Sequence, residues 1–373
     1  LSDHNKEVFN LGFDDQEIQM NHLAELILGL VDNNAAKVHY VAGLDVHSSV
    51  DNPNRRCPDL TKIRTMLGYN PKISLIPGLK RFVTWAREEF EKQQELYSLV
   101  KSCRVCNNSD LTTVISLGKT PLANSLLSKE DLNKSEEKYP LDLLYCNNCK
   151  LSQLSCVVNP EKMFRDYLYV TSTTQTFRDH FTNMAKELTG KFNLGNHSLV
   201  VDIGSNDGLL LKGFMKDGVR VIGVEPAENI SNIAREQGVD TITDFFNERV
   251  VNDIIRIKGK ADLITANNVF AHINDIQSVV ANVKKLLKDD GTFVIEVQYL
   301  LDTIKNLNFD NIYHEHVSYF CLLSLNEFFN RQDMQIFNVE HVDSHWGSLR
   351  VFIQRSDVAK HSLSQSVSKI LEE

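Results

Sequence analysis

The sequence predicts an α/β protein whose largest part is a Rossmann-like domain over residues 198–355. Three observations support this fold class. Segments with strand and helix patterns alternate regularly through that range. An apolar strand pattern at residues 199–203 leads directly into a glycine-rich turn. Two Cys-x-x-Cys pairs precede the range and predict a small metal-binding module in front of it.

The strands of the large domain are expected at regular intervals, with helices between most of them. Their expected ranges are Leu199–Ile203, Arg220–Glu225, Ala261–Ala266, Thr292–Val297, Gln335–Val342 and Ser348–Gln354, with a further short strand within 237–243. Short apolar runs of this kind are typical of buried strands. Such folds bind ligands outside the carboxyl ends of their strands, so polar residues that follow the strands are the first candidates for a site.

Composition and charge limit the possible function classes. The chain has 373 residues, of which 42% are hydrophobic and 24% charged, and its net charge is −9. At roughly 150 residues per domain, this length predicts two or three domains. A negative chain without a long basic run argues against nucleic acid as the main partner. No apolar run approaches the roughly 20 residues of a membrane span, and no signal peptide is visible, so we expect no membrane partner and a cytoplasmic location.

Residues 1–95 are expected to form a separate region that also alternates strand and helix. The expected strands are Glu7–Leu11 and Val38–Val41, and the expected helices are Met20–Val31, Asp59–Leu67 and Ile76–Phe90. The second helix should stop at Gly68, because glycine suits a helix C-terminus. The charged stretch Arg87–Lys101 should continue the third helix as a connector. Because the chain begins with Leu1 and its first element is under way by Val8, we expect it to be a piece of a longer polypeptide.

Four cysteines in two close pairs predict a metal site within residues 101–160. They are Cys103 and Cys106 in one pair, and Cys146 and Cys149 in the other. A two-residue gap lets both thiolates bind one ion, and four thiolates complete the tetrahedral shell of a structural zinc. Four unrelated thiols and a redox Cys-x-x-Cys pair are the alternatives. In a reducing compartment, the other three of the seven cysteines are expected to be free thiols.

The turn VDIGSNDG at residues 201–208 predicts a ligand site at the end of the first strand. Gly204 and Gly208 let a ligand approach the backbone closely. The turn lacks the Gly-x-Gly-x-x-Gly fingerprint of dinucleotide-binding enzymes. Asp202 would repel a pyrophosphate and suits a cationic ligand better. Glu225, after the second strand, can accept hydrogen bonds from both hydroxyls of a ribose.

Later strand ends add candidates for the same ligand. Asp244 and Phe245 follow the third strand and could hold the edge and the face of an adenine ring. Asn267 ends the fourth strand, and Asn206 and Asp207 belong to the glycine-rich turn. The turn, the carboxylate after the second strand and the order of the later strands resemble class I S-adenosylmethionine-dependent methyltransferases. The alternative is an NAD-binding Rossmann domain, complete or degenerate.

Acid and base side chains gather after the fifth strand. The segment YHEH at residues 313–316 places a carboxylate and a phenol beside histidines, which are the usual proton carriers near neutral pH. His272 follows the fourth strand and is expected at the same edge of the sheet. His345 and Arg350 flank a small-residue turn and add a cation. An isolated histidine is usually a surface or core residue, but two histidine-bearing loops at one edge predict a catalytic site.

The order of these motifs carries a second, more specific resemblance. The motifs are, in chain order, two Cys-x-x-Cys pairs, VDIGSNDG, GVEP, NNVFAH, YHEH and GSLRV. Together they cover residues 101–373 and resemble the C-methyltransferases that modify nucleotide-linked deoxysugars. The resemblance implies a zinc module (101–160), a helical connector with a substrate loop (161–197), a methyltransferase domain (198–355) and the start of a truncated C-terminal domain (356–373). It also implies S-adenosylmethionine and a structural zinc as cofactors, and a 4-keto dTDP-hexose as the methyl acceptor.

This resemblance implies roles for the polar candidates. The implied catalytic residues are His316 as general base, with Tyr313, Glu315 and His272 beside it. Tyr167 falls where the family has a substrate-loop tyrosine, and His345 and Arg350 are expected to contact the substrate. Loss of a proton beside the carbonyl would create a carbanion-like centre that attacks the sulfonium methyl in line, without a catalytic metal. The sugar, the methylated carbon and the oligomeric state stay open, and an O-methyl acceptor is an alternative.

Residues 1–95 resemble a different family. The matching motifs are FNLG (9–12), LAEL (23–26), RRCPD (55–59) and LGYNP (67–71). They are similar to the C-terminal lobe of short-chain dehydrogenase-type, NAD-dependent nucleotide-sugar epimerases, dehydratases and decarboxylases. The cofactor half of that family is missing, which implies an inactive lobe in a fusion of two nucleotide-sugar enzymes. The rival hypotheses are an NAD-dependent enzyme whose working half precedes Leu1, and a non-catalytic zinc scaffold.

The place of the cysteine pairs along the chain predicts what the metal does. They lie between the region that resembles one nucleotide-sugar enzyme and the domain that resembles another. We expect the zinc to do no chemistry and to rigidify a small lid that faces the Tyr313–His316 segment.

Overall fold

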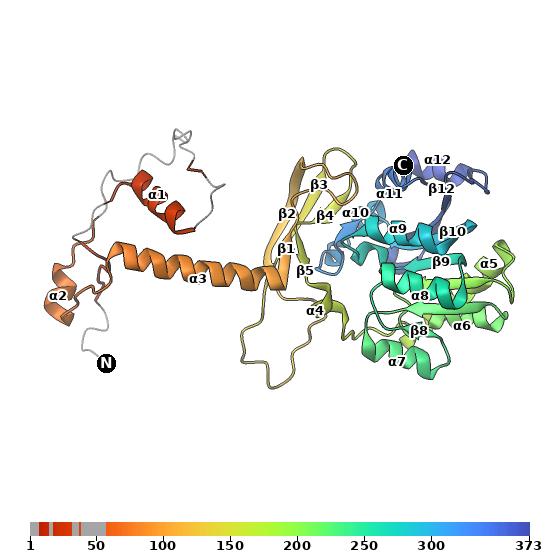
Figure 1. Ribbon diagram of the computed structural model, residues 1–373, viewed down its shortest axis with the longest axis horizontal. Helices are drawn as coiled ribbons and strands as arrows, with labels where there is room; N and C mark the ends of the chain where they lie inside the picture. The colour runs from red at the N-terminus through yellow and green to blue at the C-terminus, as the bar shows by residue number, and fades with distance from the viewer. Residues whose placement is uncertain (1–6, 15–17, 32–36, 39–56) are drawn as a thin grey trace. The chain divides into compact units, whose positions relative to one another are not determined.

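A computed structural model describes residues 7–14, 18–31, 37–38 and 57–373, with the backbone alone at 88–95 and 345. The chain splits into two compact units, Leu1–Glu95 and Leu96–Glu373, and Figure 1 shows their elements. Throughout the described ranges, no helix combines the length and the apolar character that crossing a membrane requires.

The described secondary structure of the first unit is helical (Figure 1). It consists of α1 (Met20–Val31), α2 (Thr61–Leu67) and α3 (Leu75–Leu96), the last of which ends one residue into the second unit. Gly68 ends α2 as expected: its φ is 62°, and its N–H donates to the carbonyl of Arg64. Pro77 lies in the first turn of α3, where its missing N–H costs no hydrogen bond. The helix continues past Phe90 to Leu96, so the expected connector is helical over most of its length.

One expected strand of this unit is not found, and a second falls mostly outside the described residues. Glu7–Leu11 has no regular structure, and its side chains Val8 and Leu11 are 83% and 70% exposed. A strand needs partners for its N–H and C=O groups, and the described part of this unit contains no strand that could supply them. The expected strand Val38–Val41 lies outside the described residues except for Val38.

The second unit begins with the cysteine-bearing module, which contains two small sheets. In the first, β1 (Tyr97–Leu99) pairs with β5 (Cys156–Val158). The second has the order β11–β4–β3–β2, formed by Ser318–Tyr319, Ser152–Leu154, Tyr139–Cys146 and Leu111–Thr120. β11 begins two residues after the 313–316 segment, so the pairing of β11 with β4 joins the module to the part of the large domain that carries this segment.

A connector of helices and one loop follows the module. Its elements are α4 (Pro160–Phe164), η1 (Thr171–Thr173) and α5 (Gln175–Lys191). The side chains of Asn159 and Thr174 accept hydrogen bonds from the first turns of α4 and α5, so each helix begins at a capping residue.

The large domain is built on one seven-stranded sheet with the order β12–β13–β10–β9–β6–β7–β8. Its strands are β6 (Leu199–Ile203), β7 (Arg220–Val224), β8 (Thr241–Ile242), β9 (Ala261–Asn267), β10 (Leu287–Gln298), β12 (Met334–Val342) and β13 (Ser348–Arg355). The five strands from β8 to β10 are parallel, whereas β13 is antiparallel to both of its neighbours. All predicted strands are therefore present, although β8 is shorter and β10 starts earlier than expected.

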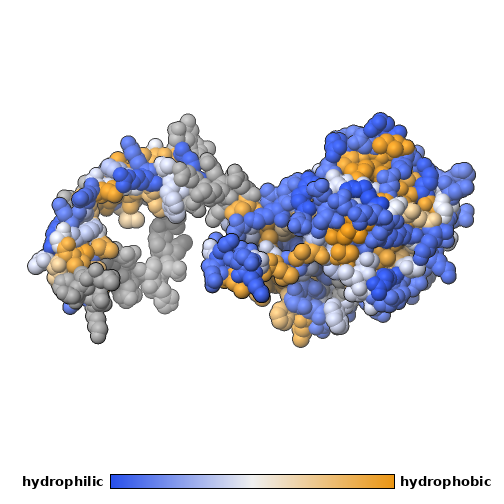
Figure 2. Space-filling model, turned by 90° about the horizontal axis from the view of Figure 1, so that it is seen from below, coloured by the Kyte–Doolittle hydropathy of each residue, from blue (hydrophilic) through white to orange (hydrophobic). Residues whose placement is uncertain are grey.

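Helices cover both faces of this sheet (Figure 1). They are α6 (Leu209–Lys216), α7 (Glu228–Glu236), α8 (Glu248–Lys258), α9 (Ile276–Leu286), α10 (Leu300–Lys305), α11 (Leu322–Arg331) and α12 (Gln365–Leu371), with the short turns η2 (Phe270–His272), η3 (Phe309–Asn311) and η4 (Ser344–Trp346). Val201 faces the apolar cluster under α8, α9 and α11, and its neighbour Val200 faces the cluster under α5 and α6. Outside these cores, the surface is mostly hydrophilic in the view of Figure 2, with separate hydrophobic patches.

Candidate active site

A large cavity opens beyond the carboxyl ends of the parallel strands of the second unit. Its volume is about 1090 Å³, at the upper end of the range for small-molecule sites. Residues from β6, β7, β9 and β10 line it together with the connector, the loop that follows β8 and the 313–316 segment. This is the edge at which open α/β sheets bind ligands.

The glycine-rich turn forms one wall of the cavity through Gly204 and Asn206. Gly204 has a φ of 65°, and a Cβ there would lie 2.7 Å from a methyl group of Val269, so both the backbone and the packing require glycine. The Asn206 side chain fastens the turn to the connector: Oδ1 accepts from Thr171 N–H at 2.9 Å, and Nδ2 donates to Tyr169 O at 3.0 Å.

Glu225 lies at the rim of this wall and is held by the backbone. Its Oε2 accepts from the N–H of Asn206 and its Oε1 from the N–H of Ala227, both at 2.9 Å. Burial raises the pKa of this carboxyl, and the two N–H donors oppose that rise. The carboxylate is therefore fixed beside the cavity, and its contact with a ribose stays a prediction.

Three of the predicted cofactor residues belong to the glycine-rich turn but do not line the cavity. Asp202 is directed toward β9, where Thr265 Oγ1 donates to it at 2.6 Å, and burial raises the pKa of its carboxyl to about 7. Asp207 is completely buried, and its carboxylate oxygens have no hydrogen-bond partner among the described residues. Gly208 begins α6 with a φ of 77°. The structure thus places two of these side chains inside the turn and Gly208 at the start of α6, and their direct contact with a ligand stays a prediction.

The loop after β8 contributes an aromatic wall. Phe245 lines the cavity, and the Arg165 guanidinium lies 4.8 Å from its ring centre. Asp244 was expected at the adenine edge, but its carboxylate pairs with Arg249 and Arg165 and does not line the cavity. Asn267, at the end of β9, does line it.

The opposite wall carries a histidine–tyrosine pair. His316 Nδ1 faces the carbonyl of Asn311 at 2.9 Å, and Nε2 faces the hydroxyl of Tyr313 at 3.0 Å. A carbonyl only accepts hydrogen bonds, so Nδ1 carries the hydrogen and, in the neutral ring, Nε2 accepts from Tyr313. Burial, and next the charge of Glu315, raise the pKa of the Tyr313 phenol, which keeps it protonated near neutral pH.

Glu315 lies behind this wall and holds a second tyrosine. Tyr167 Oη donates to Glu315 Oε2 at 2.8 Å, and Asn124 Nδ2 donates to Oε1 at 2.6 Å. Burial raises the pKa of Glu315, and both donors oppose that rise. Tyr167 and Asn124 line the cavity whereas Glu315 does not, so the structure places Glu315 as a support of the wall.

His272 completes the wall next to His316. The two imidazole rings are 5.1 Å apart between centres. The other side of His272 stacks on Phe164 of α4, at 5.9 Å and an interplanar angle of 10°. Four of the predicted catalytic and substrate-binding residues thus line the same cavity: Tyr167, His272, Tyr313 and His316.

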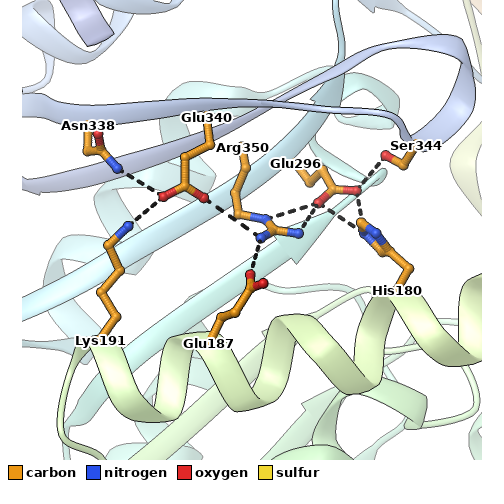
Figure 3. Close-up of polar contacts among 8 residues, drawn as sticks. All are labelled: His180, Glu187, Lys191, Glu296, Asn338, Glu340, Ser344 and Arg350. Carbon is orange, nitrogen blue, oxygen red and sulfur yellow. Dashed lines mark hydrogen bonds and ion pairs between the residues drawn. The ribbon is translucent and has the colours of Figure 1, made fainter. Parts of the chain in front are cut away.

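Arg350 does not reach this cavity, and its expected substrate contact is corrected. It is 4% exposed and lies between β13 and α5, where its guanidinium contacts Glu296 at 3.1 Å and Glu187 at 3.2 Å (Figure 3). His180 Nε2 lies 2.9 Å from the same Glu296 carboxylate. Arg350 therefore belongs to a charged network that ties α5 to the sheet. The backbone of His345 lies in η4, and its side chain is outside the described part of the chain.

The four cysteines of the module form one compact cluster. Their Sγ atoms all lie within 4.8 Å of one another, with 3.3 Å between Cys103 and Cys149 and 3.6 Å between Cys106 and Cys146. Sulfurs about 2.3 Å from a tetrahedral zinc are separated by about 3.8 Å, so a small outward movement fits the ion. Four thiolates leave no position for a substrate, as expected for a structural metal.

Several residues that line the cavity were not predicted from the sequence. They are Asn124 in the module, Phe164 and Tyr169 in the connector, and Asn268 and Gln298 at strand ends. The last two could have been found, because they directly follow predicted strands. Asn124 could not, because its contact with Glu315 spans 191 positions.

Two known protein families match separate parts of the chain. Residues 103–164 match the family described as "Putative zinc binding domain". Residues 176–339 match the family described as "Methyltransferase domain". The cysteine cluster therefore falls in the first matched region, and most of the residues that line the cavity fall in the second.

Three curated relatives illustrate the similarity. The C-methyltransferase NovU of Streptomyces niveus is 38% identical over 280 residues, which are 75% of this chain and 66% of that protein. The ubiquinone biosynthesis O-methyltransferase of Actinobacillus pleuropneumoniae serotype 7 (strain AP76) is 26% identical over 119 residues, 30% of this chain and 48% of that enzyme. The UDP-glucuronate 4-epimerase of Thermodesulfobacterium geofontis (strain OPF15) is 29% identical over 99 residues, 26% of this chain and 27% of that enzyme.

Fold, cavity and family matches lead to the same assignment. Gly204, Asn206 and Glu225 line a cavity at the carboxyl ends of the strands, and the four cysteine sulfurs form a cluster that could hold one zinc ion. The chain therefore carries an S-adenosylmethionine-dependent methyltransferase domain preceded by a zinc-binding domain.

Proposed function

We propose that the chain transfers a methyl group to a carbon atom of a nucleotide-linked 4-keto deoxysugar. The observation that carries the proposal is the His316–Tyr313 pair, which lines the same cavity as the glycine-rich turn. A methyl acceptor at carbon needs a base, because carbon is a poor nucleophile until it loses a proton. The name of the 38% identical relative, a C-methyltransferase, supports transfer to carbon. The identity of the acceptor as a nucleotide-linked sugar is inferred from the order of the sequence motifs.

In this proposal the two walls of the cavity have separate tasks. S-adenosylmethionine, when bound, supplies an electrophilic methyl group on its sulfonium. Gly204, Asn206 and Glu225 hold it, with Phe245 and Asn267 beside them. Glu225 offers its carboxylate to the ribose hydroxyls, and Phe245 offers a ring face to the adenine.

The acid–base wall prepares the acceptor. His316 Nε2 takes the proton from the carbon beside the ketone, because the Asn311 carbonyl holds the ring hydrogen on Nδ1 and the lone pair of the neutral ring is therefore on Nε2, where Tyr313 donates before the substrate binds. Tyr313 then donates its hydrogen bond to the ketone oxygen, where negative charge develops. Its raised pKa makes it a donor rather than a base. Tyr167, whose hydroxyl donates to Glu315, keeps a lone pair that can accept a hydrogen bond from a hydroxyl of the sugar.

Two experiments test the base and the acceptor. In deuterated water, the chain should exchange the proton beside the ketone of a dTDP-4-keto-6-deoxyhexose, and His316→Asn should abolish that exchange. With methyl-¹³C S-adenosylmethionine, the chemical shift of the product methyl separates attachment to carbon from attachment to oxygen. An O-methyl product, or exchange that His316→Asn leaves unchanged, contradicts the proposal.

For residues 1–95 we propose a relationship to the C-terminal lobe of nucleotide-sugar epimerases and dehydratases. The motifs of that region carry this proposal, and the chain shares a 29% identical stretch of 99 residues with a UDP-glucuronate 4-epimerase. A fusion of two such enzymes in the cytoplasm would explain the order of the chain. Calorimetry with NAD and with S-adenosylmethionine decides between the rival cofactors. Binding of NAD alone would refute the methyltransferase proposal.

A further inference from the structure

Arg104 lies between the first two cysteine ligands, but its side chain points out of the module into the large domain. It is 8% exposed. Its Nε donates to Asn274 Oδ1 at 2.9 Å, and its Nη1 donates to the carbonyl of Val317 at 2.8 Å. Its own carbonyl accepts from Gln277 Nε2 at 3.2 Å. One residue of the metal loop thus makes three contacts with the large domain.

Two of these contacts fall on the loops that carry the paired histidines. Asn274 lies two residues after His272, and Val317 directly follows His316. The fork of one guanidinium therefore spans the two loops whose imidazoles are 5.1 Å apart. The planar group holds both bonds in one fixed geometry, which an ammonium on a flexible stem does not do.

The charge of Arg104 also has an unusual environment. Its guanidinium donates to carbonyl and amide oxygens, and among the described residues it forms no ion pair with a carboxylate. A buried cation needs a compensating negative charge. Four thiolates around one Zn²⁺ carry a net charge of about −2, and Arg104 lies between two of those ligands. The cysteine cluster with zinc bound would thus supply the negative charge that balances Arg104.

We propose that Arg104 is a positioning residue that sets the spacing of His272 and His316 and ties that spacing to the filled metal centre. The catalytic part of this inference rests on the proposed function, whereas the geometric part does not. The metal centre then acts on the reaction without touching a substrate, through one side chain. Loss of the metal would leave the loop that carries Arg104 without its anchor. It would also remove the negative charge that balances Arg104.

Arg104→Lys tests this role because it keeps the positive charge and loses the fork. With histidines labelled with ¹³C at Cε1, we expect the NMR signals of His272 and His316 to move, while that of the exposed His197 stays. We expect kcat to fall by about 10²-fold, the scale for misplaced catalytic groups, with the affinity for S-adenosylmethionine and the zinc content unchanged. The NMR readout does not need turnover, so it stays informative if the proposed reaction is wrong.

Two further variants keep the test sharp. Asn274→Ala removes one acceptor at an exposed position, so it should fold normally and move the His272 signal more than the His316 signal. Arg256→Lys, at a side chain 72% exposed, is the matched control and should move neither signal. The proposal is overturned if Arg104→Lys leaves both signals in place, or if it moves the His197 signal as much as the other two.

Discussion

The two walls of the cavity are assembled in different ways. The cofactor wall comes from strand ends of a single sheet, such as Gly204 after β6 and Glu225 after β7. The acid–base wall brings together Asn124 of the zinc module, Tyr167 of the connector and the 313–316 segment. A wall built from neighbouring strands forms whenever the sheet folds. A wall built from distant segments depends on how the module docks, so we expect the two walls to respond separately to mutation.

The largest effect is expected at the base. His316→Asn should lower kcat by about 10³-fold, within the range for loss of a general base. Because His316 lies on the wall opposite the glycine-rich turn, calorimetry should show unchanged affinity for S-adenosylmethionine. The exposed His197→Asn serves as the control and should match the wild type in both measurements. A loss of cofactor affinity in His316→Asn would show that the walls are not independent.

A second effect concerns the stability of the cofactor wall. Burial raises the pKa of Asp202 from 3.8 to about 7, so the folded state binds more protons than the unfolded state between those values. Stability should therefore fall as the pH rises from about 4 to about 7 and stay level above that. Asp202→Asn keeps an acceptor for Thr265 and removes the charge.

The variant should be more stable than the wild type at pH 8 by an amount on the order of 4 kcal/mol, and nearly equal to it at pH 4. Urea unfolding at the two pH values measures the difference. An equal gain in the free energy of unfolding at both pH values would show that the buried charge is not the cause of the gain.

Glu225 provides the corresponding test of ligand binding. Glu225→Ala removes the acceptor of two backbone N–H groups and the carboxylate offered to the ribose. We expect the affinity for S-adenosylmethionine to fall by about 30-fold, or about 2 kcal/mol. Glu228→Ala, at an exposed glutamate three residues further on, is the matched control. Proton exchange in the sugar should persist in Glu225→Ala, and its loss would contradict the separation of the walls.

The same difference between the walls explains how much the sequence could predict. The strand at 199–203 and the carboxylate of Glu225 were predictable because an apolar run and a strand end are local patterns. Asn124 was not, because nothing near it in the sequence indicates a contact with Glu315. The expectation for Arg350 was wrong for another reason: side chains alternate along a strand, and its position after a turn did not show that it faces α5.

The smallest effect is expected at the joint between the module and the acid–base wall. Asn124→Ala removes one donor to Glu315, leaving Tyr167 as the other hydrogen-bonding side chain on that carboxylate. A charge-assisted hydrogen bond of this kind contributes about 1.5 kcal/mol, so kcat/KM for the sugar should fall by about 10-fold with cofactor affinity intact. Asn133→Ala, exposed in the same segment, should leave both unchanged. If Asn124→Ala weakened cofactor binding instead, the module would support both walls, and the dependence on docking inferred for one wall would extend to the whole cavity.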